Sequence, residues 1–305
     1  MPAYDVAAYI GEAVASVFNQ RFHDFEIIVV NDGSPDTDAL ERALQPYRDR
    51  IVYLRQENLG AAVARNTALR AAQGEFVAFL DADDIWLPDF LSEQIGFLQR
   101  HPECDLVYCD ALLFGTAQYE GRRYMEFAPS DGDVTFSALL QASCNVITSG
   151  VLAKRRTIVD AGGFDPGLRR GQDYDLWLRL ARKGTRLAYQ RKPLLRRRLH
   201  TQSLSGDALE QMKREAAVIE WFLDHNELSP HESGTVRDVL AVLRSNVCVE
   251  RAKRLLAAGS FQGAAEELDA AIRLRSAWKL RLIRLGLRLS PRSLLLIQRW
   301  RTGNL

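Results

Sequence analysis

The sequence contains little of what marks several large classes of protein. Only four of its 305 residues are cysteine, and no two of them form a CxxC pair. This excludes a disulfide-stapled miniprotein and predicts reduced, mostly buried thiols in a cytoplasmic protein. Neither a G-x-G-x-x-G string nor a P-loop string occurs. That absence disfavours a dinucleotide-binding oxidoreductase and a sugar nucleotidyltransferase.

Long apolar runs are also missing. The chain opens on Met1-Pro2-Ala3-Tyr4-Asp5, which has neither the basic start nor the apolar core of a secretory signal. The longest uncharged stretch, Val134–Ala153, carries Thr, Ser, Gln and Asn throughout, so it is not a predicted membrane span. Hydrophobic residues nevertheless make up 47% of the sequence and charged residues 26%, which is typical of a globular protein.

The first hundred residues alternate between helical and strand-like patterns. Helices are predicted over Val6–Asn19, Asp38–Tyr47 and Ala61–Ala72, and strands over Phe25–Val30, Ile51–Arg55 and Phe76–Leu80. This alternation predicts an α/β domain with a largely parallel sheet. Ligands of such sheets bind beyond the carboxyl ends of the strands. Acidic clusters around Asp32 and Asp81 follow two of these ends, which indicates a site there.

Three carboxylates follow the strand predicted over Phe76–Leu80. Asp81, Asp83 and Asp84 would repel one another unless positive charge lies nearby. Mg²⁺ or Mn²⁺ could supply it, because these cations bind one or two carboxylates together with phosphate oxygens and water. The alternative is a turn whose aspartates cap a helix. Similarly, Asp32 belongs either to a simple turn or to a site where it accepts a hydrogen bond from a nucleobase N–H.

Two later polar residues also have two interpretations. Asp173 lies in the first turn of a predicted helix, where the helix dipole favours a carboxylate. It either caps that helix or acts as a general base on a sugar hydroxyl. His200 follows a strand predicted over Arg186–Leu199. A lone histidine is more often an ordinary surface or core residue than a metal ligand, so His200 alone decides nothing.

The composition changes beyond Ser205. Helices are predicted over Ala208–His225, Thr235–Ala258, Phe261–Arg273 and Trp278–Leu289. The segment Ala270–Leu305 contains nine Lys or Arg residues and no acid. It is either a solvated helix face or a contact for an anionic membrane surface. We therefore expect two parts, residues 1–205 and residues 206–305.

The ordered set of motifs resembles the family-2 glycosyltransferases of the GT-A fold, inverting enzymes found in bacterial cell-wall and polysaccharide biosynthesis. The resemblance covers about residues 2–205 and rests on Pro2-Ala3-Tyr4, Asn31-Asp32-Gly33-Ser34, Glu57-Asn58-Leu59-Gly60, Arg65-Asn66, Asp81-Ala82-Asp83-Asp84, Gly162-Gly163-Phe164-Asp165, the Asp173 segment, and Arg198-Leu199-His200 to Ser205. No single motif decides the matter, but their order and spacing are highly specific.

The resemblance implies a mixed, mainly parallel sheet flanked by helices, with an α-helical C-terminal extension. It implies inverting transfer of a sugar from a nucleoside diphosphate, commonly UDP, to the hydroxyl of a glycan or lipid-linked acceptor. Such an enzyme would work in the cytoplasm, or peripherally at the cytoplasmic face of the membrane, without a nucleic-acid partner. The family has a β-strand directly before its Pro-Ala-Tyr motif, so the first strand is expected to be missing here.

The roles of individual residues are implied by the same resemblance. Nucleotide binding is assigned to Pro2, Ala3, Tyr4, Asp32, Arg65 and Asp81; Mn²⁺ or Mg²⁺ binding to Asp83 and His200, with Asp84 in support; and general-base catalysis to Asp173. Gln172 stands where the family usually has Glu, which leaves Asp173 itself in place. The alternative is a catalytically impaired nucleotide-binding or scaffold protein that works through its helical tail.

Overall fold

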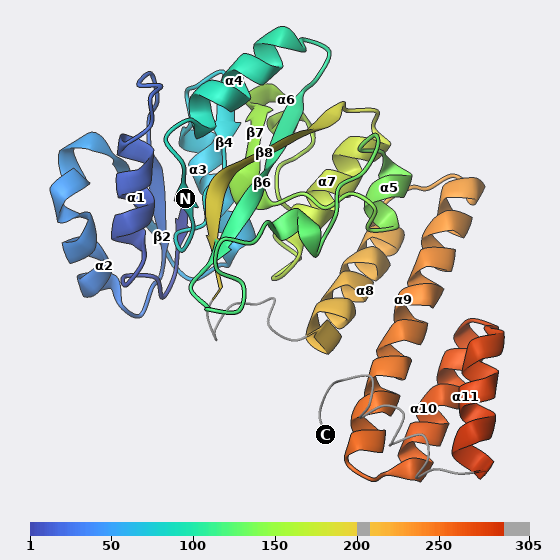
Figure 1. Ribbon diagram of the computed structural model, residues 1–305. Helices are drawn as coiled ribbons and strands as arrows, with labels where there is room; N and C mark the ends of the chain where they lie inside the picture. The colour runs from blue at the N-terminus through green and yellow to red at the C-terminus, as the bar shows by residue number, and fades with distance from the viewer. Residues whose placement is uncertain (200–207, 290–305) are drawn as a thin grey trace. The chain divides into compact units, whose positions relative to one another are not determined.

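The computed structural model describes residues 1–199 and 208–289 (Figure 1). The chain forms two compact units, Met1–Thr201 and Gln202–Leu305. The described part of the first unit contains strands and helices, and that of the second contains helices only. The structure therefore confirms the mixed α/β architecture with an α-helical C-terminal region.

The helices and strands predicted in the first unit occur in the predicted order, and further elements lie between residues 85 and 160. Its strands are β1 (Pro2–Ala3), β2 (Ile28–Asp32), β3 (Val52–Gln56), β4 (Phe76–Ala78), β5 (Ile85–Trp86), β6 (Leu106–Phe114), β7 (Val151–Lys154) and β8 (Leu187–Arg198). Its α-helices are α1 (Ile10–Phe18), α2 (Thr37–Leu44), α3 (Ala61–Ala71), α4 (Phe90–Arg100), α5 (Phe136–Leu140), α6 (Arg155–Asp160) and α7 (Gln172–Arg182). Short 3₁₀ turns are η1 (Gln45–Arg50), η2 (Tyr124–Glu126) and η3 (Thr148–Gly150).

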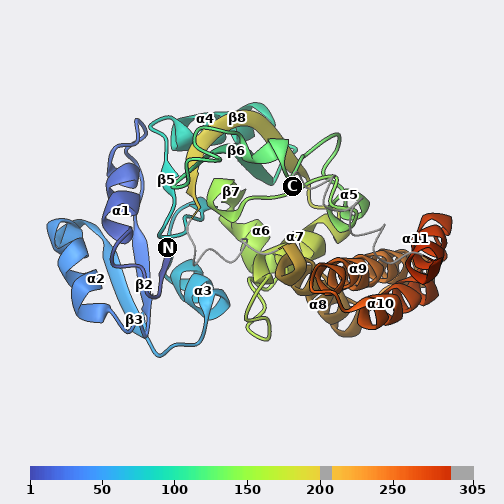
Figure 2. The same cartoon turned by 60° about the horizontal axis from the view of Figure 1, so that its bottom comes forward.

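Strand β2 is the middle strand of a parallel three-stranded sheet, β1-β2-β3. Its side chains alternate between the two faces, as a strand covered on both sides requires. Val29 packs in the cluster that includes residues of α1 and α2, whereas Ile28 and Val30 pack with Ala64 of α3. Figure 2 shows α1 and α2 on one side of β2 and α3 on the other.

The strand predicted over Phe25–Val30 begins and ends later than expected. Parallel pairing with β3 continues as far as Asp32, which lies opposite Gln56. The prediction of a turn at Asn31 and Asp32 is therefore wrong for these two residues, which close β2. As a result, the carboxylate of Asp32 is fixed at the carboxyl end of a fully buried strand.

The second sheet has five strands in the order β4-β7-β6-β8-β5. Strands β6 and β8 pair in parallel over their whole length, with a bulge around Asp110. Strand β7 is antiparallel to both β4 and β6, and β5 is antiparallel to β8. The expectation of a largely parallel sheet thus holds for the first sheet and for β6–β8, while the remaining pairs make the architecture mixed.

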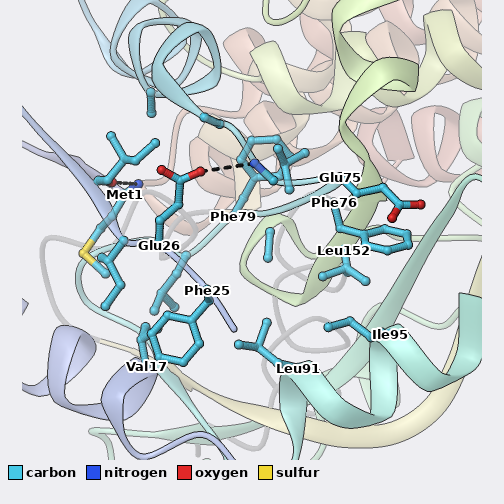
Figure 3. Close-up of a pocket in the computed structure, with 18 of the residues that line it drawn as sticks. Met1, Val17, Phe25, Glu26, Glu75, Phe76, Phe79, Leu91, Ile95 and Leu152 are labelled. Atoms are coloured by element: carbon cyan, nitrogen blue, oxygen red, sulfur yellow. Dashed lines mark hydrogen bonds between the residues drawn. The ribbon is translucent and has the colours of Figure 1, made fainter. Parts of the chain in front are cut away.

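The first strand is present as two residues only. β1 pairs with β2, and within the described residues β4 pairs with β7, so the two sheets are not hydrogen-bonded to each other. A cavity of about 710 Å³ lies between the start of β2 and β4. Figure 3 shows Met1, Phe25, Phe76 and Leu91 around it, and most of its lining is apolar. The short β1 therefore leaves open space beside two strand edges.

The N-terminal amine of Met1 lies inside the protein. It donates a hydrogen bond of 2.8 Å to the carbonyl of Ile28. Burial lowers the pKa of this amine from 8.0 to about 5, because the charged form loses its hydration. The positive charge of Arg65 lowers the pKa further, and the negative charge of Asp81 opposes the shift. The start of this chain is therefore electrostatically coupled to the acidic cluster.

We expect the free energy of unfolding of this 305-residue chain to rise with pH between about 5 and 8. In this window the amine of the unfolded chain is protonated, whereas the amine of the folded chain is not. The unfolded state therefore binds more protons, so lowering the pH stabilises it relative to the folded state. The slope contributed by the amine is at most about 1.4 kcal/mol per pH unit. Urea unfolding across this window, with and without acetylation of the amine, measures the effect. An unchanged pH dependence after acetylation contradicts it.

The second unit is built from consecutive antiparallel helices. Its described helices are α8 (Ala208–His225), α9 (Pro230–Ala257), α10 (Phe261–Leu274) and α11 (Trp278–Leu289). Helix α9 begins five residues before the predicted Thr235, because Ser229 and Glu232 form a capping box and Pro230 occupies the first turn. A small core centred on Ala264 and Leu268 joins α9, α10 and α11. No helix in the described ranges is long and apolar enough to cross a membrane.

Candidate functional site

The acidic cluster lies in the loop between β4 and β5. Strand β4 ends at Ala78, two residues before the predicted end, and the loop that follows carries the carboxylates. An Oδ1 atom of Asp81 accepts a hydrogen bond of 2.6 Å from Nη2 of Arg65, on α3. The backbone N–H of Asp81 donates to Oγ of Ser149, on η3, at 3.1 Å. Asp81 is therefore fixed from two segments that are distant in sequence.

Asp84 is the buried member of the cluster. Its Oδ1 accepts a hydrogen bond of 3.0 Å from the backbone N–H of Arg198, at the end of β8. Burial raises the pKa of this carboxyl, and the negative charges of Asp83 and Asp81 raise it further. The nearby charge of Arg197 opposes these effects. The raised pKa of Asp84 therefore reflects burial first and then repulsion by the charges of Asp83 and Asp81.

Arginines supply part of the positive charge that the cluster requires. Besides Arg65 and Arg197, Arg198 donates from Nε to the carbonyl of Asp83 at 3.0 Å. Within residues 1–199 and 208–289, no group of three metal-ligating side chains is arranged to hold an ion. His200, predicted as a metal ligand, lies outside the described residues. A hard cation that also takes phosphate oxygens and water needs only one or two carboxylates from the protein.

Arg65 has unused hydrogen-bond donors. The residue is only 6% exposed, and its Nε and Nη1 atoms have no hydrogen-bond partner in the part of the chain that the structure describes. Leaving such donors unpaired in a buried position costs free energy, so an acceptor is expected beside them. An anionic group or an ordered water would satisfy these atoms. Arg65 therefore positions Asp81 and keeps donors for a further acceptor.

The carboxylate of Asp32 organises the loop that follows β3. Its two oxygens accept hydrogen bonds from the side chain of Gln56 at 2.7 Å and from the backbone N–H groups of Leu59 and Gly60 at 3.0 and 2.8 Å. These three bonds leave limited acceptor capacity for any other donor. The structure thus gives Asp32 a local role that the sequence did not reveal.

The predicted Pro2-Ala3-Tyr4 motif lies beside the end of β2. Ala3 is buried and pairs with Asn31, while Tyr4 is exposed. The next residue, Asp5, donates its backbone N–H to Oγ of Ser34 at 2.7 Å. The motif and the Asn31-Asp32-Gly33-Ser34 motif are therefore brought together, as both were assigned to one nucleotide pocket.

Asp173 lies in the first turn of helix α7 and is half-buried. Its Oδ2 accepts a hydrogen bond of 2.6 Å from the hydroxyl of Thr148. Thr148 and Ser149 are consecutive residues of η3, and Ser149 holds Asp81. One short turn therefore links the Asp173 carboxylate to the acidic cluster, although the two are more than ninety positions apart in the sequence.

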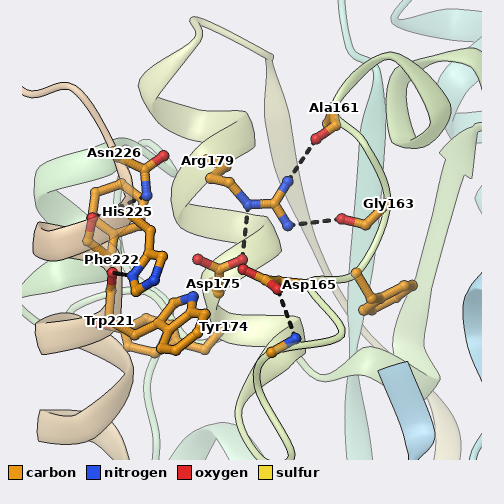
Figure 4. A network of polar contacts seen from close by, with 12 residues as sticks. Ala161, Gly163, Asp165, Tyr174, Asp175, Arg179, Trp221, Phe222, His225 and Asn226 are labelled. Atoms are coloured by element: carbon orange, nitrogen blue, oxygen red, sulfur yellow. Dashed lines mark hydrogen bonds and ion pairs between the residues drawn. The ribbon is translucent and has the colours of Figure 1, made fainter. Parts of the chain in front are cut away.

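The Gly162-Gly163-Phe164 loop is fastened from two helices. The side chain of Asn66, on α3, exchanges two hydrogen bonds with the backbone of Phe164, at 2.6 and 2.9 Å. Arg179, on α7, donates to the carbonyls of Ala161 and Gly163 at 2.6 and 2.7 Å. Figure 4 shows this guanidinium between the loop and the buried carboxylate of Asp175, which it contacts at 2.8 Å. The loop therefore joins α3 to α7.

These contacts close into a ring. Beginning at Asp81, it runs through α3 (Arg65, Asn66), the Gly163-Phe164 loop, α7 (Arg179, Asp173) and η3 (Thr148, Ser149), and returns to Asp81. We call this set the polar ring. Its members come from five segments of the first unit. The ring fixes two acidic groups, Asp81 and Asp173, that the sequence had placed in separate motifs.

A family model described as "Glycosyl transferase family 2" matches residues 1–156. The match covers the β1–β7 region and the acidic cluster. The chain belongs to glycosyltransferase family 2. The resemblance inferred from the sequence motifs is thus confirmed.

Curated relatives agree with this assignment, and solved structures share the fold. The chain is 33% identical over 228 residues to the putative teichuronic acid biosynthesis glycosyltransferase TuaG of Bacillus subtilis, which covers 73% of this chain and 84% of TuaG. It is 30% identical over 227 residues to WfgD of Escherichia coli, a UDP-Glc:alpha-D-GlcNAc-diphosphoundecaprenol beta-1,3-glucosyltransferase, covering 74% of this chain and 85% of WfgD. The mannosyltransferase PcManGT of Pyrobaculum calidifontis, solved with GDP-Man and Mn²⁺, superposes with a TM-score of 0.64 over 99% of this chain and 81% of its own, at 19% identity.

Sequence reasoning assigned no role to several residues that the structure brings to this candidate site. Thr148 and Ser149 lie in the uncharged but polar stretch Val134–Ala153, and that polarity was the only local signal. Arg197 and Arg198 end a run of three arginines that is separated from His200 by Leu199. Arg198 belongs to one of the sequence motifs but was given no role, although charge at the end of a predicted strand was the stronger signal. Their partners lie far away in the sequence, so only the folded chain identifies them.

Replacing Gly163 with alanine should destabilise the protein more than replacing Gly162. Both glycines have positive φ values, 69° and 84°, so each alanine has a backbone cost of about 1 kcal/mol. A Cβ at position 163 would also lie 2.5 Å from Oδ1 of Asn66, whereas one at position 162 meets nothing within 4 Å. We expect Gly163→Ala to cost about 2–4 kcal/mol. Denaturant unfolding compares the pair, and equal losses contradict a clash at the loop.

Proposed function

We propose that this family-2 glycosyltransferase is an inverting enzyme that transfers a sugar from a UDP-sugar to an acceptor hydroxyl in cell-envelope polysaccharide synthesis. Residues 1–205 would form the transferase and residues 206–305 a separate helical part. The polar ring is the observation that carries this proposal. It ties a carboxylate suited to deprotonating an acceptor to an acidic cluster suited to a nucleotide diphosphate. The named activities of TuaG and WfgD support the substrate class.

The donor nucleotide would bind along the carboxyl ends of β1 and β2. In this proposal, Asp32 accepts an N–H of the base, the Pro2-Ala3-Tyr4 backbone lines the same pocket, and Asp81 contacts the ribose. Arg65 positions Asp81 through their 2.6 Å contact and offers its unpaired donors to an acceptor nearby. Ligands of α/β sheets bind at such strand ends.

The residues of the acidic cluster fit a divalent cation. Asp83, with His200, would hold Mn²⁺ or Mg²⁺, and Asp84 would support the arrangement. The raised pKa of Asp84, caused by burial and by its two acidic neighbours, indicates that added positive charge would be stabilised there. When bound, such a cation neutralises charge that develops on the departing diphosphate. The Mn²⁺ complex of the structurally similar mannosyltransferase supports this choice.

Asp173 would act as the general base. Its carboxylate takes the proton of the acceptor hydroxyl while that oxygen forms a bond to the anomeric carbon. The bond from this carbon to the diphosphate oxygen breaks, and its electron pair leaves with the nucleotide. Because attack and departure occur on opposite faces of the sugar, the base and the diphosphate site must come from different segments. The separation of Asp173 from the acidic cluster in sequence meets this requirement.

A nucleotide-binding or scaffold role without turnover is the second candidate. The observation that favours it is the cavity beside the two-residue β1, which leaves two strand edges unpaired near the nucleotide side. Unpaired edges lower local rigidity. Transfer assays distinguish the two functions, because a scaffold binds a nucleotide without releasing UDP from a UDP-sugar.

Calorimetric titration of UDP, with and without Mn²⁺, tests the donor site. We expect saturable binding that requires Mn²⁺ and that is lost in Asp83→Ala. The matched control is Asp89→Ala, an aspartate outside the cluster whose partner is the exposed Arg21. Binding that is unchanged without metal, or unchanged in Asp83→Ala, contradicts the assignment. Titration of GDP and dTDP then tests the choice of base.

Two substitutions test the general base and its support. Asp173→Asn should lower kcat by about 10²–10⁴ and leave UDP binding intact. Thr148→Val removes the 2.6 Å hydrogen bond that holds the Asp173 carboxylate in place. The base should then be positioned less well, so kcat should fall while the affinity for UDP stays unchanged.

Thr157→Val, on helix α6, is the matched control for the Thr148 substitution. It removes a hydroxyl from the same unit and should leave kcat unchanged. A Thr148→Val enzyme that keeps wild-type kcat, or that loses UDP binding together with kcat, contradicts a role of Thr148 in positioning the base. An Asp173→Asn enzyme that keeps wild-type kcat would exclude Asp173 as the base.

A further inference from the structure

Helix α11 has an inner apolar side that explains its packing in the second unit. Leu287 is buried, and Leu280 packs against the same small core formed with α9 and α10. Between them, Arg284 forms an ion pair with Asp269 of α10, with Nε–Oδ1 and Nη2–Oδ2 distances of 2.9 and 3.0 Å. One such side is what a helix at the edge of a bundle needs.

The same helix carries a second apolar side that faces solvent. Trp278, Leu282, Leu285 and Leu289 are spaced by four, three and four residues, so they lie along one side of α11, opposite Leu280 and Leu287. Their exposed fractions are 67%, 57%, 51% and 75%. We call these four residues the outer stripe. Soluble monomers rarely expose a contiguous apolar surface of this kind, which marks interaction sites.

Positive charge borders the outer stripe. Lys279, Arg281 and Arg288 are exposed on α11, and we call them the basic flank. The ammonium of Lys279 lies 5.7 Å from the centre of the Trp278 ring. The sequence from Ala270 to Leu305 contains no acid, and Asp269, directly before it, is paired with Arg284. A partner for the outer stripe must therefore be apolar and anionic at once.

A second copy of the chain does not meet this condition. In a two-fold contact between outer stripes, each basic flank would lie against the flank of the other copy, and like charges would oppose association. An anionic lipid surface meets both conditions. Leucines enter the acyl boundary, tryptophan prefers the headgroup level, and Lys and Arg stems extend their charges to the headgroups.

We propose that α11 docks on an anionic membrane surface through the outer stripe, with the basic flank on the lipid headgroups. The proposal concerns the second unit alone and needs no transfer activity. Docking would bring the transferase to a lipid-linked acceptor, a consequence that rests on the proposed function. The lipid diphosphate acceptor in the name of WfgD is consistent with it.

Vesicle flotation of the full chain tests the proposal. The vesicles are phosphatidylcholine alone, or phosphatidylcholine with about one third phosphatidylglycerol as the anionic lipid. We expect binding to the anionic vesicles that weakens as salt is raised, and no binding to the neutral ones. No binding by a folded chain to anionic vesicles overturns the proposal, and so does equal binding to both vesicle types.

Two double variants test the surface itself. Arg281→Gln/Arg288→Gln should lower the partition coefficient about 30-fold, since each charge near the surface contributes about 1 kcal/mol. Leu282→Ser/Leu285→Ser should lower it at least tenfold. The matched controls are Arg42→Gln/Arg156→Gln, which removes the same charge, and Val52→Ser/Val159→Ser, which removes exposed apolar groups in the first unit. Both controls should bind as the wild type does.

The remaining outcomes show whether a lipid surface or a second copy of the chain occupies the outer stripe. Wild-type binding by the Leu282→Ser/Leu285→Ser variant assigns the contact to another segment and overturns the proposal. Self-association that this variant abolishes, without vesicle binding by the wild type, assigns the stripe to a second copy and also overturns it. Circular dichroism establishes that each variant is folded. UDP titration of the same variants is a separate readout, so failure of the nucleotide site and failure of membrane docking are distinguishable.

Discussion

The need to hold three neighbouring carboxylates at the end of β4 is the constraint on which much of the first unit depends. Burial and the charges of Asp83 and Asp81 raise the pKa of Asp84. The chain offsets this repulsion by bringing Arg65 from α3 and the end of β8, with Arg198, to the same loop. Because these partners are far away in sequence, the cluster exists only when helix, loop and strand have closed around it.

The polar ring extends this arrangement to the general-base candidate. Two links of the ring are made by adjacent residues of α3, where Arg65 contacts Asp81 and Asn66 contacts Phe164. Two more are made by adjacent residues of η3, where Thr148 contacts Asp173 and Ser149 contacts Asp81. Adjacent residues of one helix or turn have a fixed relative position, so a displacement of one residue of such a pair also displaces the other. The ring therefore couples the position of the acidic cluster to that of Asp173. The proposed inverting transfer would use this coupling, because its base and its departing diphosphate act on opposite faces of one sugar.

The second unit is organised by the packing of its helices. Its helices are joined by a small core, and α11 uses only one of its two apolar sides there. The stripe that faces solvent and the acid-free basic sequence around it are separate observations that agree on one kind of partner. If α11 docks on lipid, the unit would locate the transferase, while the chemistry would belong to the first unit alone.

The sequence by itself determined the alternation of helices and strands over the first eighty residues, the helical character of the second unit, the family, and the place of the acidic cluster after a strand. Local patterns sufficed for these because apolar periodicity and motif spacing involve neighbouring residues. They also sufficed for α8 and α11, whose ends match the prediction. The tertiary structure alone decided that β2 runs on to Asp32, that β4 pairs antiparallel with β7, and that Thr148 contacts Asp173. Each of these depends on a partner some twenty to eighty positions away, and no local pattern encodes such pairings.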